Sequence, residues 1–177
     1  MFNCLFVIIS MCTAIKWQQT DVLIKWTDGI QLKYKDFARQ QFNEADSNLL
    51  KDKLATISCY IKYEVKIESG KRIVSAYAVM NPQKSWIGVQ DSDVLNHEQG
   101  HFDITEIYAR RFQKEINDTT ITGLHDYFVY LTTVYSQVQE EFIQEQAKYD
   151  GWTMNAPGKE YYFKWIREQL ATSNKSH

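Results

Sequence analysis

The spacing of apolar residues changes near residue 91, and this change constrains the fold more than any other feature of the sequence. Between residues 21 and 86, apolar and polar side chains alternate, as they do on strands with one buried face. From residue 91 onward, apolar side chains recur every three or four positions, which is typical of amphipathic helices. The order of the two patterns predicts an α+β fold in which an antiparallel N-terminal sheet packs against C-terminal helices.

The first half of the chain predicts an antiparallel sheet of about three to five strands. Residues 22–26 and 30–34 flank a turn signal and predict a hairpin. Residues 55–65 and 72–80 predict two longer strands that are joined by a turn. Residues 37–53, which lie between the hairpin and the longer strands, leave room for a short helix.

The second half of the chain predicts three helices. The first begins with Ser92 as its N-cap and runs to about residue 115. The second runs from about residue 125 to residue 149 and is stopped by Asp150-Gly151, and the third covers residues 159–171. The apolar stripe of the second helix consists of Phe128, Leu131, Tyr135, Val138, Phe142 and Tyr149.

The composition is that of a globular protein and excludes several other classes. Of the 177 residues, 44% are hydrophobic and 24% are charged, so the chain is not intrinsically disordered and its length suits one domain. The net charge is −2, and lysine and arginine form no run. A nucleic acid or an anionic membrane surface is therefore not an expected partner.

The first fourteen residues resemble a secretory signal peptide. They carry no charged side chain, and their apolar core ends in the small-residue site Cys12-Thr13-Ala14. This apolar run is too short to span a bilayer. We therefore expect a secreted or periplasmic protein, with residues 15–177 as a single mature domain that has no integral membrane segment. Two alternatives are a buried first strand and acylation of Cys12, and the bulky Met11 argues against acylation.

Residues His97-Glu98-Gln99-Gly100-His101 form an H-E-x-x-H motif in the first predicted helix. Helical residues four positions apart lie one turn apart on nearly the same face, so both imidazoles can reach one Zn²⁺ ion. Glu98 lies beside the metal, where a carboxylate can act as general base on a water that zinc has made acidic. A core helix seldom buries two imidazoles and a carboxylate together, because each needs a polar partner. The motif therefore favours metal ligation over a structural histidine pair.

The sequence offers several candidates for a third protein ligand. The longer motif H-E-x-x-H-x-x-G-x-x-H is excluded, because Ile104 and Ile107 occupy its last two fixed positions. Asp103 and Glu106 point away from the histidines by more than about 100° around the helix, so we discard both. If the second helix returns antiparallel, a rise of about 1.5 Å per residue sets residues 141–150 opposite the motif. The carboxylates in this window that remain as candidates are Glu141, Glu145 and Asp150.

The motif and its flanks resemble a bacterial family of secreted zinc-dependent proteases that is still largely described as a domain of unknown function. The resemblance rests on Ser85-Trp86-Ile87 and on residues 94–106. It extends over most of the mature chain, through Ile24-Lys25-Trp26, residues 32–37 and Tyr149-Asp150-x-x-Thr153.

This resemblance implies a zincin-like helix, bound Zn²⁺ and Asp150 as the third ligand. Family members typically carry a His-Gly or similar pair after the threonine, where this chain has Met154-Asn155-Ala156. If that histidine serves metal binding or catalysis in relatives, the site of this chain is altered or weakened.

Together these features predict an exported zinc-dependent peptidase that acts on a peptide or protein substrate. Glu98 would take a proton from water and later return it to the leaving amine. An edge strand formed by residues 72–80 would align an extended peptide by strand addition. One alternative is a metal-dependent amidase that acts on cell-wall peptides. The other is a non-catalytic exported module that keeps the histidine pair for a structural metal or for none.

Overall fold

The computed structural model describes residues 22–38 and 54–173. The predicted signal peptide lies outside these ranges, and so does most of the segment 37–53 in which a short helix was expected. Just before that segment, the structure shows the 3₁₀ turn η1 (Tyr34–Asp36), and the described start of the segment forms a parallel bridge between Ala38 and Trp86.

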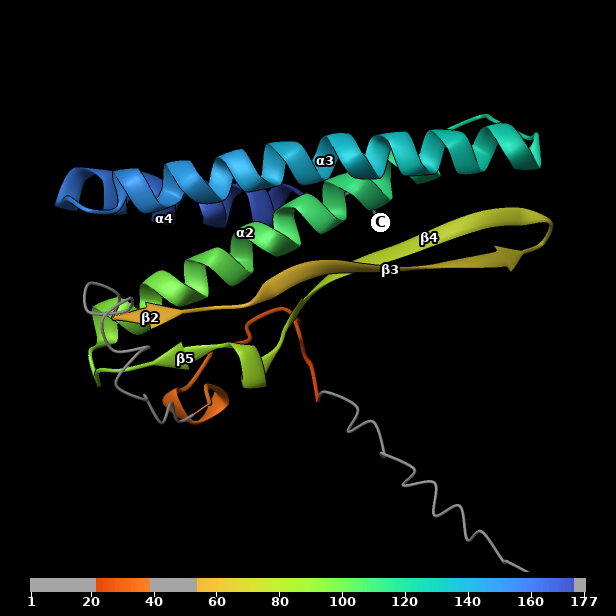
Figure 1. The fold of residues 1–177 in the computed structure, drawn as a ribbon. Coiled ribbons are helices and arrows are strands. Elements are labelled where there is room, and N and C mark those ends of the chain that lie inside the picture. The colour runs from red at the N-terminus through yellow and green to blue at the C-terminus, as the bar shows by residue number, and fades with distance from the viewer. Residues whose placement is uncertain (1–21, 39–53, 174–177) are drawn as a thin grey trace, which may run out of the picture.

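The described residues form an α+β fold, as predicted, with strands first and helices after them. The N-terminal elements are β1 (Ile24–Lys25), β2 (Ala55–Thr56), β3 (Cys59–Glu68), β4 (Lys71–Met80), η2 (Pro82–Lys84) and β5 (Trp86–Ile87). The helices are α2 (Ser92–Asn117), α3 (Leu124–Trp152) and α4 (Ala156–Ser173). Helix α2 lies between the β3–β4 hairpin and the other two helices (Figure 1), so it contacts every layer of the molecule.

Strand β4 is the middle strand of the antiparallel sheet β1-β4-β3. It pairs with β3 along its whole length, and the chain reverses at Ser69 and Gly70, whose φ angles of 49° and 79° suit a two-residue hairpin turn. On its other edge, β4 pairs with β1 in a register that sets Ile24 opposite Met80. The prediction that residues 72–80 form an edge strand is therefore wrong.

The predicted hairpin of residues 22–26 and 30–34 is also wrong. A turn does follow β1, but the chain beyond it forms no strand, and β1 pairs with β4 instead. The N–H of Trp26 donates to the carbonyl of Ala78 at 2.9 Å, and the N–H of Leu32 donates to the side chain of Gln99. The long β4 strand and helix α2 thus satisfy backbone groups that a local hairpin would otherwise pair.

The strand predicted for residues 55–65 is interrupted at Ile57 and Ser58. Residues before the break form β2, which pairs with β5 in a separate two-stranded sheet, and residues after it form β3. The break has its own hydrogen bonds, because the N–H of Ser58 donates to the hydroxyl of Ser85 and the carbonyl of Ser58 accepts from the N–H of Asn81. Ser85 and Asn81 therefore provide the hydrogen bonds that strand pairing does not provide at Ser58.

Side chains of α2 cover the part of β4 that β1 is too short to reach. The N–H groups of Ala78 and Ala76 donate to Glu106 and Gln113, each at 2.8 Å. Further along the strand, the Asn117 side chain accepts from the Val74 N–H and donates to the Val74 carbonyl. An exposed strand edge invites pairing with other chains, and here a helix closes it.

The helices follow the predicted order with shifted ends. Asp91 rather than Ser92 caps α2, because its side chain accepts from the N–H of Asp93. Helix α3 continues through Asp150 and Gly151, where an end was predicted, and α4 begins at Ala156 instead of residue 159. None of the helices in the described ranges has an apolar stretch long enough to cross a membrane.

Four of the six residues predicted for the apolar stripe of α3 are buried, namely Leu131, Val138, Phe142 and Tyr149, and the buried face differs at the other two positions. Phe128, which was placed on that stripe, is 47% exposed, whereas Tyr127 and Val134 are buried. The buried residues of α3 are Tyr127, Leu131, Val134, Val138, Phe142 and Tyr149. They pack with Ile104 and Phe112 of α2 in the larger of two apolar clusters.

The hydrogen bond that Gln113 provides to β4 should contribute measurably to stability. Gln113→Ala leaves the buried Ala76 N–H without its acceptor, and we expect a loss of about 1–3 kcal/mol in the free energy of unfolding. Gln113→Glu keeps an acceptor at the same place and should retain most of that stability. Denaturant unfolding measures both, with Gln137→Ala at an exposed position of α3 as control. Equal losses in the Ala and Glu variants would contradict this role.

Candidate metal centre

Three predicted ligands meet where the start of α2 passes the end of α3. The Nε2 atoms of His97 and His101 lie 3.1 Å apart, and each lies within 3.1 Å of Oδ1 of Asp150. The antiparallel return of α3 brings these residues together although Asp150 is about fifty residues away along the chain. The three side chains form a group that can hold a metal ion.

The other carboxylates considered from the sequence have different partners. Glu141 forms an ion pair with Arg111, and Glu145 accepts a hydrogen bond from the phenol of Tyr162. Asp103 accepts from the indole of Trp26 and from Gln99. Glu106 is bonded to Ala78 and Arg110 on the side of α2 that faces the sheet. None of these four carboxylates joins the described cluster of histidines.

The electrostatics of the cluster favour positive charge. Burial lowers the pKa of His101, but hydrogen bonds to Asp150 and Gln146 outweigh it, so that the pKa is raised overall. Hydrogen bonds from His101 and His97 hold the pKa of the Asp150 carboxyl far below its usual range. The two shifts share a cause, which is that an anionic oxygen faces two imidazole nitrogens. A proton or a metal cation can satisfy this arrangement.

Glu98 lies in the same cleft but is not part of the cluster. Its side chain is buried, and this burial raises the pKa of its carboxyl against the opposing effect of His101 and His97. A hydrogen bond from the backbone N–H of Ile57 partly offsets the shift. Because Ile57 directly follows β2, this bond places the Glu98 carboxylate between the metal-ligand cluster and the short strand.

A cleft of about 730 Å³ opens above the cluster. Its walls come from β2 and the residues after it, from the start of α2 and from the end of α3. The lining residues are Leu54, Ala55, Thr56, Ile57, Cys59, Asp93, Val94, His97, Glu98, His101, Phe142, Gln146, Asp150, Thr153, Met154 and Lys159. Strand β2 pairs only with β5 among the described residues, and both of its residues line this cleft.

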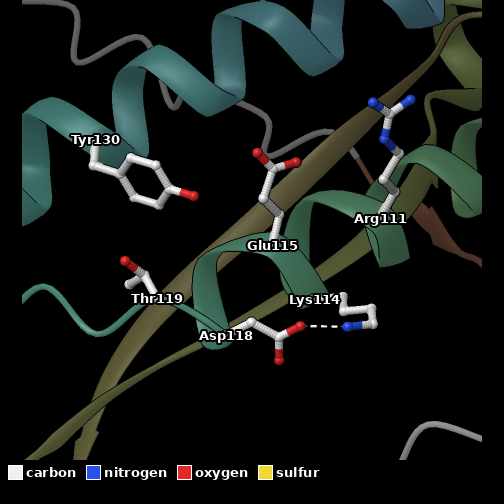
Figure 2. Close-up of a pocket in the computed structure, with 6 residues that line it drawn as sticks. All are labelled: Arg111, Lys114, Glu115, Asp118, Thr119 and Tyr130. Carbon is white, nitrogen blue, oxygen red and sulfur yellow. Dashed lines mark hydrogen bonds and ion pairs between the residues drawn. The ribbon is translucent and has the colours of Figure 1, made fainter.

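A second, smaller hollow of about 380 Å³ lies at the opposite end of α2. Figure 2 shows Lys114 paired with Asp118 along the helix, with the Tyr130 ring of α3 nearby. Arg111 of this hollow is already paired with Glu141. Both cations of this hollow are thus engaged in ion pairs, whereas the group of described side chains that can hold a metal ion lies in the cleft above the histidines.

Tyr149, which the sequence placed on the apolar stripe of the second helix, is buried and packs against the histidines. Its ring stacks on the His97 ring at a centroid distance of 4.8 Å, and its hydroxyl donates to the His97 carbonyl. This packing needs a glycine in the motif, because a Cβ on Gly100 would lie 2.0 Å from the Tyr149 hydroxyl oxygen. In the sequence, the signal for this contact is Gly100 itself. A glycine in the middle of a helix lowers stability, so its presence there indicates close packing against a neighbour.

Comparison of the chain with protein-family models, curated proteins and solved structures finds no match. The resemblance to secreted zinc-dependent proteases therefore stays a prediction. The candidate metal centre rests on the distances between its own side chains.

The contact between Gly100 and Tyr149 predicts opposite effects of alanine at two helical glycines. Gly100→Ala should lower the free energy of unfolding by about 1–3 kcal/mol, because the buried Tyr149 ring has to move. Gly151→Ala should be neutral or raise stability by up to about 1 kcal/mol, because its Cβ would meet nothing within 4 Å. Thermal or denaturant unfolding of the two variants compares them directly. If both are as stable as the parent, the close approach of the helices is not required.

Proposed function

We propose that this protein is an exported zinc-dependent peptidase in which His97, His101 and Asp150 hold Zn²⁺. The observation that carries the proposal is the convergence of two imidazole nitrogens and one carboxylate oxygen within 3.1 Å of one another, beside a buried glutamate. These donor types fit zinc. Three protein ligands are typical of catalytic zinc, which keeps a fourth position open, whereas structural zinc is closed by four.

The chain's own residues can supply the proton transfers of peptide hydrolysis. When bound, Zn²⁺ supplies a Lewis acid that polarises a carbonyl group and lowers the pKa of water. The Glu98 carboxylate accepts the proton of the attacking water and returns it to the leaving amine. Its burial favours this task, because burial raises the pKa of Glu98 toward neutral pH and makes it a stronger base. The Ile57 N–H holds the carboxylate in place.

The proposed substrate is an extended peptide that lies along β2. The strand first considered for this role, residues 72–80, has both edges covered, by β3 on one side and by β1 and α2 on the other. Strand β2 instead borders the cleft that contains Glu98 and the histidines. Strand addition would give the peptide main-chain hydrogen bonds beside the proposed base.

The non-catalytic module remains a second candidate because of Met154. This side chain stands where the resemblance places a histidine, and it is 89% exposed at the rim of the cleft. A module that keeps the metal without hydrolysis would bind zinc and cleave no peptide. Screening the purified protein against a peptide library, with cell-wall peptides included, separates the peptidase, the amidase and the non-catalytic module.

The metal site predicts a specific pattern of zinc loss. The protein should bind about one Zn²⁺ per chain, and His97→Ala or His101→Ala should abolish binding. Asp150→Ala and Asp150→Glu should both weaken it strongly, because a longer side chain misplaces the ligand oxygen. Glu141→Ala and Glu145→Ala are matched controls that should leave binding nearly intact. Zinc titration with elemental analysis measures all six variants. Loss of zinc in Glu145→Ala with retention in Asp150→Ala would refute the assignment.

The general-base role predicts a separation of metal binding from turnover. Glu98→Gln is nearly isosteric but cannot accept a proton, so it should keep zinc and lose at least about 100-fold in kcat. The rate is measured on a peptide identified in the library screen, with zinc content determined on the same sample. Turnover equal to that of the parent protein would show that another group acts as the base.

A further inference from the structure

The end of α3 and its C-cap residue present three polar side chains on one arc, at positions 146, 150 and 153. At about 100° per residue, Gln146 and Thr153 lie within about 60° of Asp150, one turn before it and one turn after it. The histidines of α2 are also one turn apart, and the two helices are antiparallel. Gln146 therefore lies opposite His101, and Thr153 lies opposite His97.

Gln146 accepts a hydrogen bond from the ring of His101. Its Oε1 lies 2.5 Å from His101 Nδ1, and its Nε2 donates to the backbone carbonyl of His101 at 3.1 Å. Because that carbonyl can only accept, the amide nitrogen has to face it, and the amide oxygen is left for the ring. The proton between Gln146 and His101 therefore belongs to Nδ1 of the histidine.

Thr153 does the same for His97. Its hydroxyl donates its one proton to the carbonyl of Tyr149 at 2.6 Å, so the oxygen acts as acceptor toward His97 Nδ1 at 3.2 Å. With both Nδ1 atoms protonated, a neutral imidazole carries its lone pair on Nε2. In this neutral tautomer both lone pairs face Oδ1 of Asp150, and a metal cation among the three atoms would satisfy all of them.

From these contacts we infer that Gln146 and Thr153 are positioning residues that fix the ring orientation and tautomer of the two histidines for metal binding. The inference rests on the proposed zinc site and extends it to a second segment. The end of α3 and its C-cap together supply the third ligand and one acceptor for each histidine, in the pattern Gln146-x-x-Tyr149-Asp150-x-x-Thr153. The H-E-x-x-H motif of α2 is one half of the centre, and this segment of α3 is the other half.

The test compares zinc affinity in paired variants, measured by competition with a chelator of known affinity. Gln146→Leu and Thr153→Val remove the acceptors and should each weaken zinc binding by about 10–100-fold. Gln146→Glu and Thr153→Ser keep an acceptor and should restore affinity to near that of the parent protein. Gln144→Leu, at an exposed position of the same helix, is the control and should change nothing.

A spectroscopic measurement separates positioning from a general loss of structure. In the zinc-loaded parent protein, NMR of ¹⁵N-labelled histidine should show slowly exchanging Nδ1–H protons on His97 and His101. The His101 signal should exchange rapidly in Gln146→Leu, and the His97 signal should do so in Thr153→Val, while the backbone amide spectrum stays that of the folded protein. If Gln146→Leu does not fold, the Thr153 pair decides the question.

The two proposals fail in different ways. If the parent protein binds no zinc, the proposed function and the positioning roles are both overturned. If it binds zinc and Gln146→Leu and Thr153→Val bind it equally well, the positioning roles alone are overturned. The positioning roles also fail if Gln146→Glu and Thr153→Ser lose as much affinity as the apolar variants, because the effect would then not depend on the acceptor.

Discussion

The rotation of α2 about its own axis is set by hydrogen bonds to the open edge of β4, and the rest of the structure depends on it. Glu106, Gln113 and Asn117 reach the strand from one arc of the helix. At about 100° per residue, this arc lies roughly opposite His97 and His101. Sealing the strand edge therefore turns the histidines away from the sheet and toward α3. The same bonds explain why a two-residue β1 suffices, since buried backbone groups of β4 are satisfied without a longer partner.

The second constraint is the close approach of α2 and α3 at Gly100. Tyr149 occupies the space that a Cβ would fill, and its hydroxyl holds the backbone of His97. This contact fixes the register of α3 along α2, because few other positions allow an aromatic ring to pack against a backbone that carries no side chain. Asp150 follows Tyr149 directly and so reaches both imidazoles. The register of the candidate metal centre thus comes from packing beside it, and its three side chains need not hold the helices together themselves.

The sequence predicted the fold class and the two histidines, since both follow from periodicity and local spacing. The choice of third carboxylate could not be read in the same way. Glu145 lies on the buried stripe of α3 and Asp150 lies at its flank, so the stripe alone favours Glu145. Helix α3 faces two neighbours, however, and Glu145 is directed to Tyr162 of α4. A hydrophobic stripe does not indicate which of two neighbouring helices each of its residues contacts. For the same reason, the stripe wrongly predicted that Phe128 is buried.

The interruption between β2 and β3 could not be predicted either, because Ile57, Cys59, Ile61 and Tyr63 continue one alternating pattern through it. The hydrogen bond to Glu98 explains this interruption. A buried carboxylate needs a donor, and the Ile57 N–H provides one because it is released from the ladder of the larger sheet. The same interruption lets β2 leave β4 and run along the cleft. One local departure from regular strand geometry therefore brings the proposed base and the proposed substrate-binding strand to the same cleft as the candidate metal centre.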